Sequence, residues 1–154
     1  VLGCNLGMFY KRRDYSRVVN GRNPIVAHEY LGDSVEGKTV FIADDIIASG
    51  ESMLEVASNL KARGAKRIIA DATFPLFTSG LDKFDKAVEE GTLDYVVGTN
   101  LTYRKPELLN RDWYVDVDVS KYAAYFIVAL NHDMSVSSII DPIKKIEALL
   151  ASRK

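Results

Sequence analysis

Thr-Val-Phe-Ile-Ala-Asp-Asp-Ile-Ile-Ala-Ser-Gly-Glu-Ser occupies residues 39–52 and carries the clearest architectural signal of the chain. Its first five residues, Thr39–Ala43, form a short and almost wholly apolar run, which predicts a strand buried on both faces of a parallel sheet. Two adjacent carboxylates, Asp44 and Asp45, come next, and a small turn then leads into a helix. Because the first turn of a helix leaves backbone N–H groups without helical partners, this order predicts a ligand site at the carboxyl end of a strand.

The turn offers the groups that a sugar phosphate requires. The hydroxyls of Ser49 and Ser52 and the N–H groups of the helix start can surround a phosphate, while the two acids can accept hydrogen bonds from neighbouring sugar hydroxyls. The alternative is an ordinary strand, turn and capped helix, but that alternative leaves paired acids at the end of an apolar strand without a ligand. We therefore expect a sugar-phosphate site made by Asp44, Asp45, Ala48, Ser49, Gly50, Glu51 and Ser52.

The rest of the chain alternates between strand and helix patterns, which predicts a single α/β domain with a mainly parallel twisted sheet flanked by helices. The basic stretch Lys11–Pro24 lies between two strand patterns and predicts a long flexible hairpin. The loops at 74–80 and 99–100 should reach the same sheet edge as the acids. The expected strands are Leu6–Tyr10, Ile25–Leu31, Thr39–Ala43, Arg67–Thr73, Asp94–Thr99 and Trp113–Val117; the expected helices are a segment through Met53 and Leu60 that stops at Gly64, Leu81–Glu90, Ser120–Asn131 and Asp141–Lys154, the last capped by Asp141 with Pro142 at its first position.

Composition narrows the functional classes. The chain has 154 residues, of which 47% are hydrophobic and 27% charged, and its net charge is −1, which argues against a nucleic-acid binder. Its single cysteine, Cys4, and the lack of a transmembrane run or signal peptide predict a soluble cytoplasmic protein without a membrane partner. His28 and His132 belong to no spaced cluster of ligands, so we expect no metal held by protein side chains alone.

Residues 39–52 resemble the ribose 5-phosphate motif of the phosphoribosyltransferase fold, in which two acids are followed by Thr-Gly-Gly-Thr or Thr-Ala-Gly-Thr. Serines replace both threonines here, at Ser49 and Ser52, and the hydroxyls are kept. Glu51 departs from the pattern because it stands where the family usually has glycine. Either its side chain points away into solvent, which we favour, or phosphate binding is weakened.

Further segments, in the same order and at similar spacing, resemble ribose-phosphate pyrophosphokinases, which carry the phosphoribosyltransferase fold in their C-terminal domain. They cover nearly all of the chain, and the set is more specific than any one of them. The matching segments are Met8–Arg13 with its Lys-Arg-Arg triplet, Gly32–Lys38, Leu76–Gly80, Thr99–Asn100 and Ser135–Ser138.

The resemblance implies transfer of pyrophosphate from ATP to ribose 5-phosphate, with Mg²⁺ as cofactor, to give phosphoribosyl pyrophosphate and AMP. It also implies a transferase or kinase of nucleotide biosynthesis that forms a homo-oligomer. Lys11 and Arg13 align with the two cations of the family's catalytic loop, where they would neutralise charge on the transferring phosphates. A solvated basic turn is the alternative for the Lys-Arg-Arg triplet.

The alignment begins inside the second of the family's two domains. We therefore expect residues 1–154 to be most of a C-terminal domain whose N-terminal domain is absent, and to be inactive alone. Two other functions stay open. A nucleobase phosphoribosyltransferase shares the acidic motif, and Glu51 is compatible with a non-catalytic regulatory relative of the kinase.

Overall fold

The computed structural model describes residues 3–13, 16 and 25–152, with the side chains of 11–13 and 25–28 excluded. The strands are β1 (Met8–Arg13), β2 (Ile25–Leu31), β3 (Thr39–Ile47), β4 (Arg67–Pro75), β5 (Tyr95–Thr99) and β6 (Tyr114–Val117). The helices are α1 (Glu51–Ala62), α2 (Asp82–Glu89), α3 (Pro106–Leu109), α4 (Ser120–Asn131), α5 (Ser137–Ile140) and α6 (Ile143–Ala151).

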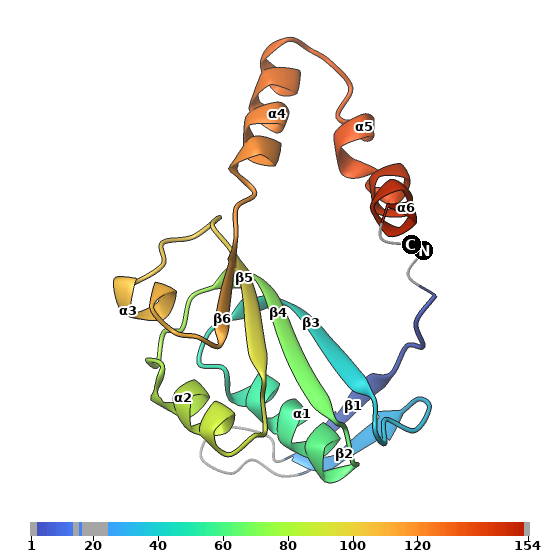
Figure 1. Ribbon diagram of the computed structural model, residues 1–154, viewed down its shortest axis with the longest axis vertical. Coiled ribbons are helices and arrows are strands. Elements are labelled where there is room, and N and C mark those ends of the chain that lie inside the picture. Colours follow the sequence, from blue (N-terminus) through green and yellow to red (C-terminus); the bar gives the residue numbers. More distant parts are fainter. Residues whose placement is uncertain (1–2, 14–15, 17–24, 153–154) are drawn as a thin grey trace.

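Strands β3 to β6 form a four-stranded parallel sheet in the order β3-β4-β5-β6, which confirms the predicted α/β architecture (Figure 1). Ile42 pairs with Ala70, Ala70 with Val96, and Val96 with Tyr114, so one row of side chains crosses the whole sheet. Strands β1 and β2 pair antiparallel as a separate ribbon, which agrees with the predicted pairing. The predicted bounds of the first strand, Leu6–Tyr10, are wrong, because β1 runs from Met8 to Arg13 and includes the start of the basic stretch.

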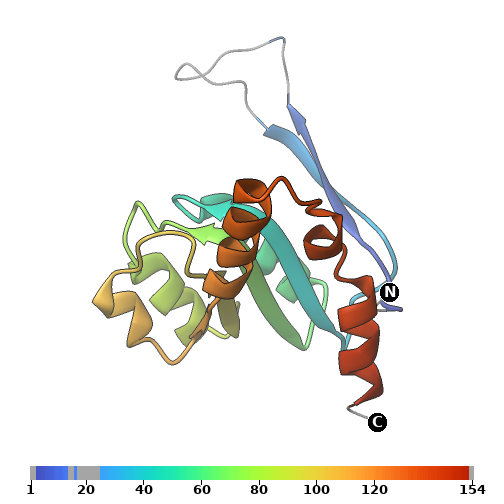
Figure 2. The same cartoon turned by 90° about the horizontal axis from the view of Figure 1, so that it is seen from above.

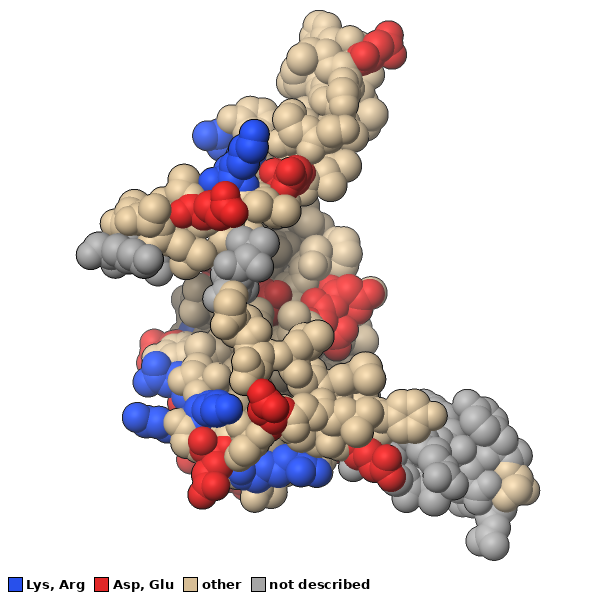
Figure 3. Space-filling view, turned by 90° about the vertical axis from the view of Figure 1, so that its right-hand side faces the viewer, with Lys and Arg blue, Asp and Glu red and all other residues tan. Residues whose placement is uncertain are grey.

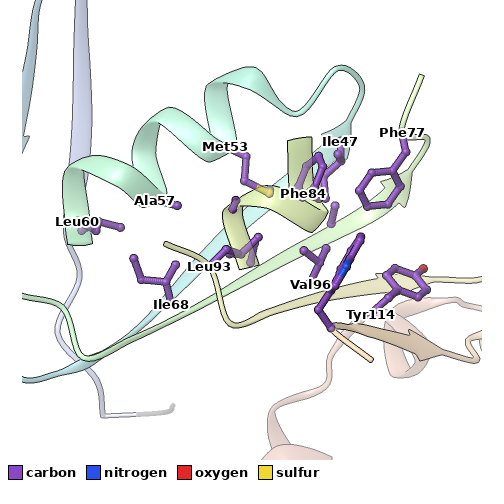
Figure 4. Close-up of a cluster of buried hydrophobic side chains, with 14 of the residues drawn as sticks. Ile47, Met53, Ala57, Leu60, Ile68, Phe77, Phe84, Leu93, Val96 and Tyr114 are labelled. Carbon is purple, nitrogen blue, oxygen red and sulfur yellow. The ribbon is translucent and has the colours of Figure 1, made fainter. Parts of the chain in front are cut away.

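The hydrophobic core lies between the sheet and the helices α1 and α2 (Figure 4). Helix α1 contributes the buried residues Met53, Ala57 and Leu60 at helical spacing, and α2 contributes Phe84 and Ala87. Ala70 and Val96 meet these helices from the sheet and are completely buried. This packing fixes α1 and α2 against one face of the sheet, and the start of α1 lies next to the carboxyl end of β3, where the predicted ligand site lies.

The predicted ends of several elements need correction. Strand β3 continues to Ile47, four residues beyond the predicted end at Ala43, so Asp44 and Asp45 lie within it. Strand β4 likewise runs to Pro75 instead of Thr73. Both strands extend because each continues to pair with the other, Ile46 with Phe74 and Ile47 with Pro75, which the local pattern could not show.

Helices α4, α5 and α6 form an arm that extends beyond the carboxyl ends of the strands, with α5 and α6 apart from the sheet (Figures 1 and 2). The predicted last helix is shorter than expected, because α6 begins at Ile143 and ends at Ala151. The prediction of Asp141 as N-cap with Pro142 at the first position is wrong, because Pro142 is the N-cap residue; Oδ1 of Asp141 accepts a hydrogen bond of 3.0 Å from the Ile143 amide from one position earlier. Residues 153–154 lie outside the described part of the chain, and the short helices α3 and α5 were not predicted.

Basic and acidic side chains are interspersed over the lower part of the side drawn in Figure 3. Within the described ranges, no helix combines the length and apolarity that crossing a bilayer requires.

Candidate functional site

The two acids of the predicted site lie on the last part of β3, and both are exposed. The Asp45 amide donates a hydrogen bond of 2.8 Å to Oδ1 of Asp44. Asp44 stands opposite Ala72 in the ladder with β4, whereas the next recorded pair on the carboxyl side is Ile46 with Phe74. The carboxylates therefore border the carboxyl edge of the sheet and remain open to a ligand.

Gly50 forms the turn between β3 and α1 and adopts a left-handed conformation with φ 76°. A Cβ atom at this position would lie 2.3 Å from the ring of Phe84, because α2 packs directly beneath the turn. Glycine is thus required both by the backbone conformation and by the close approach of an aromatic ring. The turn is held in one shape by the hydrophobic core.

The start of α1 leaves backbone donors available, as the sequence predicted. The first helical hydrogen bond runs from the Leu54 amide to the Gly50 carbonyl at 3.0 Å. The Glu51 amide lies 3.5 Å from Oγ of Ser49, which is a weak contact. The amides of Ser52 and Met53 find no acceptor among the described residues, so the helix start can accept an anion.

Glu51 is tied to the neighbouring helix. Its Oε1 lies 2.6 Å from Nζ of Lys83 on α2, and both side chains are more than half exposed. A shallow hollow between α1 and α2 is lined by Glu51, Leu54, Ser58 and Lys83 together with Lys86, Ala87, Glu90 and Thr92. The sequence favoured a Glu51 side chain that points into solvent. The structure shows in addition that this side chain contacts Lys83, which lies 32 positions away in the sequence.

The loop after β4 is bonded directly to the loop after β3. The Leu76 and Phe77 amides donate to the Ile47 carbonyl at 2.9 and 3.1 Å, and the Thr78 amide donates to the Ala48 carbonyl at 2.9 Å. Phe77 has φ 45°, a strained value for an aromatic residue, and its ring packs 4.8 Å from that of Phe84. The two loops thus form one unit, as their positions at the same sheet edge predicted.

The loop after β5 is joined instead to the start of α4. Nδ2 of Asn100 donates to Asp118 Oδ1 at 2.6 Å and to Ser120 Oγ at 2.8 Å, and Oδ1 of Asn100 accepts from the Val119 amide at 2.9 Å. Hydrogen bonds from the Ser120 hydroxyl and amide, and from Asn100, lower the pKa of the Asp118 carboxyl. Asn100 therefore serves as a structural clamp on α4 in this structure.

A partly buried ion pair lies next to this clamp. Nε of Arg104 is 3.1 Å from Oδ1 of Asp116. Burial, reinforced by the charge of Asp116, raises the pKa of the nearby Tyr114 hydroxyl to about 12. Tyr114 is therefore neutral at physiological pH and does not act as a base there.

The predicted loop cations belong to the β1–β2 ribbon. Lys11 stands opposite His28, and the pairing shifts between Arg12 and Arg13. The side chains of Lys11 and Arg13 lie outside what the structure describes. At the base of the ribbon, the guanidinium of Arg63 at the end of α1 stacks 5.3 Å from the centre of the Tyr30 ring.

The described residues contain no group of three or more His, Cys, Asp or Glu side chains that could hold a metal ion. Asp44 and Asp45 supply two neighbouring carboxylates only. Adjacent residues of a strand point to opposite faces, so these two acids do not form a chelating pair. Mg²⁺ commonly binds through one or two carboxylates, waters and substrate phosphates, so a single one of these acids fits a site shared with substrate.

Comparisons with known proteins agree with this architecture. Residues 1–122 match the family "Phosphoribosyl transferase domain". The chain is 29% identical over 135 residues to a ribose-phosphate pyrophosphokinase of Shewanella oneidensis, covering 88% of this chain and 40% of that protein. It is 31% identical over 140 residues to the ribose-phosphate pyrophosphokinase of Thermotoga maritima, covering 90% of this chain and 40% of the relative.

A solved structure supports the fold. The phosphoribosylpyrophosphate synthetase of Mycobacterium smegmatis superposes with a TM-score of 0.59 and 22% identity, over 70% of this chain and 34% of that chain. The chain spans about two fifths of the length of the curated relatives named above. The resemblance to ribose-phosphate pyrophosphokinases that the motifs predicted is confirmed, and the chain belongs to the phosphoribosyl transferase domain family.

Proposed function

We propose that this chain supplies the ribose 5-phosphate site of a ribose-phosphate pyrophosphokinase. The observation that carries the proposal is the end of β3 and the turn that follows it, where exposed Asp44 and Asp45 on the strand precede a left-handed glycine and a helix start with available amides. The phosphate would bind the amides of Ser52 and Met53 and the hydroxyls of Ser49 and Ser52. The acids would accept hydrogen bonds from the ring hydroxyls of the sugar.

In the proposed reaction, the 1-hydroxyl oxygen of ribose 5-phosphate forms a bond to the β-phosphorus of ATP. The bond from that phosphorus to the oxygen bridging it to the α-phosphate breaks, AMP leaves with this oxygen, and the proton of the 1-hydroxyl passes to solvent. Charge spreads over the transferring oxygens, so cations that close over them lower the barrier. Lys11 and Arg13 on β1 are our candidates for that role.

We further propose that Mg²⁺ and ATP bind in part to residues outside this site. Mg²⁺, when bound, would offset negative charge on the phosphates of the nucleotide. One of the acids Asp44 and Asp45 would supply a carboxylate ligand that the ion shares with phosphate oxygens and water. The proposal thus concerns a transferase that works in the cytoplasm as a homo-oligomer, with ATP and ribose 5-phosphate as its partners.

The chain is proposed to be most of a C-terminal domain that needs an N-terminal domain for catalysis. A coupled assay for AMP release measures this directly. We expect ribose 5-phosphate binding without AMP release from residues 1–154 alone. Sustained turnover by these residues would show that the active site is complete within them.

The site itself is tested by calorimetric titration with ribose 5-phosphate. We expect Asp44→Asn and Asp45→Asn to weaken binding by about tenfold each, since a charge-assisted hydrogen bond contributes about 1.5–3 kcal/mol. Asp112→Asn removes an exposed acid elsewhere and is the matched control. Equal binding by the two site variants and the control would overturn the assignment of the acids.

A regulatory relative of the kinase is a second candidate, because Glu51 places a negative charge in the first turn of α1. The variant Glu51→Gly separates the two functions. Binding of ribose 5-phosphate by the unaltered chain supports a working site. Binding that is seen only with Glu51→Gly supports a site that has lost its ligand and a non-catalytic role.

A further inference from the structure

We propose that Lys83 is a positioning residue for the phosphate-binding turn, an inference that rests on the function proposed above. Lys83 holds the Glu51 carboxylate against α2 and offsets its charge, so that a phosphate dianion can approach the start of α1. The two residues are separated by 32 positions in sequence, and their side chains meet at 2.6 Å.

The direction of Glu51 carries the first step. Glu51, Leu54 and Ser58 line the hollow between α1 and α2, and their spacing places them on one stripe of α1. The carboxylate therefore lies along the flank of the helix, where Lys83 meets it, instead of extending beyond the first turn. In that position it leaves the amides of Ser52 and Met53 open.

The second step is the rigidity of α2. Phe84, the neighbour of Lys83 in sequence, is completely buried and lies directly beneath Gly50. Asp85 accepts two hydrogen bonds of 2.9 Å from Arg111 and one of 2.7 Å from Nε1 of Trp113. These contacts fasten α2 both to the turn and to the segment before β6, so the backbone that carries Lys83 is fixed relative to the turn.

The third step is electrostatic. A carboxylate at a helix start competes with an incoming phosphate for the same positive end of the helix dipole. An ammonium group in contact with that carboxylate reduces the net charge that the phosphate meets to near zero. The exposed pair adds little to folding stability, so its main effect falls on anion binding.

The experiment titrates ribose 5-phosphate into the unaltered 154-residue chain and its variants by calorimetry at low and high salt. We expect Lys83→Ala to weaken binding about three- to tenfold at low salt, and the deficit to shrink at high salt because the exposed Glu51 charge is then screened. Lys83→Arg should keep the affinity. The double variant Glu51→Gln/Lys83→Ala should recover it to within about twofold, because no charge then needs a partner.

Lys86→Ala is the matched control, because Lys86 lies on the same helix and pairs with Glu90 at 3.7 Å instead. Thermal unfolding midpoints check that each variant is folded. Unchanged binding by Lys83→Ala, an equal loss in Lys86→Ala, or a double variant as weak as Lys83→Ala would each overturn this inference alone. Failure of the unaltered chain to bind would overturn the proposed function, and the role of Lys83 with it.

Discussion

The two faces of the β3–β6 sheet carry similar apolar side chains but differ in what covers them. On the face toward α1 and α2, Ile68, Ala70 and Val96 are completely buried. On the other face, none of the helices in the described ranges covers Phe41 or Tyr95, which are 59% and 41% exposed. We call this second surface the open face; it also includes Val115 and Val117.

The difference between the two faces shows which side of the sheet supports the proposed site. The turn after β3 is braced from the covered face, since Phe84 lies under Gly50 and Phe77 packs against Phe84. Within the described residues, the open face has no such aromatic packing beneath the turn. A parallel sheet is normally buried on both faces, and the sequence predicted this for Thr39–Ala43. That prediction is wrong within the described residues, because Phe41 on β3 is largely exposed.

The largest effect is expected from Phe84→Ala, which removes a ring from the covered face. We expect a loss of about 3–5 kcal/mol in the free energy of unfolding, measured by denaturant titration. Phe41→Ala on the open face is the control and should cost less than about 1 kcal/mol. Similar losses for the two variants would show that the open face is covered in solution and would end the comparison.

The next largest effect is expected from Gly50→Ala. The new Cβ would lie 2.3 Å from the Phe84 ring at φ 76°, so we expect about 2–3 kcal/mol of destabilisation together with weaker ribose 5-phosphate binding. Gly91→Ala is a sharp control, because Gly91 has φ 69° but meets nothing within 4 Å. Gly91→Ala should lower the free energy of unfolding by only about 1 kcal/mol. An equal loss for the two variants would show that contact with Phe84 does not contribute to the effect of Gly50→Ala.

A smaller, pH-dependent effect is expected from Asp85→Asn. Burial acts to raise the pKa of the Asp85 carboxyl, but hydrogen bonds from Arg111 and Trp113 and the charge of Arg111 outweigh it and hold the pKa below its ordinary value. A lowered folded-state pKa gives stability that is present above the unfolded pKa of about 3.9 and lost as the pH falls through the folded value.

We therefore expect Asp85→Asn to lose about 1–2 kcal/mol at pH 7 and to show a flatter stability profile than the unaltered chain below about pH 4. Urea titrations at a series of pH values measure the free energy of unfolding of both proteins. Glu89→Gln, an exposed position on the same helix, should leave the profile in place. A profile that persists in Asp85→Asn would assign the acid sensitivity to other carboxyls.

The smallest effect is expected from Asn100→Ala, which cuts the clamp between the β5 loop and α4 without touching the covered face. The loss should be about 1 kcal/mol, and the first-turn amides of α4 should exchange faster with deuterium. Asn131→Ala at the other end of α4 is the control. Unchanged exchange in Asn100→Ala would mean that other contacts hold the arm.

Local patterns were sufficient to predict most elements. The alternation of apolar runs with helical spacing located β2 and α4 at their observed bounds, and Gly64 ends α1 with φ 85° as predicted. The ends of β3 and β4 were placed too early because polar residues such as Asp44 look like strand terminators. Pairing between the two strands outweighed that local preference.

The residues of the proposed site also fall into those that a local motif predicted and those that it did not. Its acids, serines and glycine are adjacent in the chain, so a single motif predicted them together. Lys83, Phe84 and Asn100 act on their partners through contacts between distant segments, and no spacing rule connects such positions. The sequence left two options for Glu51, a side chain in solvent or weakened phosphate binding, and it did not indicate the contact with Lys83.

The sequence alone determined the type of each main element and the chemistry of the turn after β3, because hydrophobic periodicity and turn residues act over a few positions. Only the tertiary structure decided how far the strands extend, which sheet face is covered, and which cation meets Glu51. Those features depend on side chains brought together by packing from remote parts of the chain. Sequence patterns do not contain that distance information.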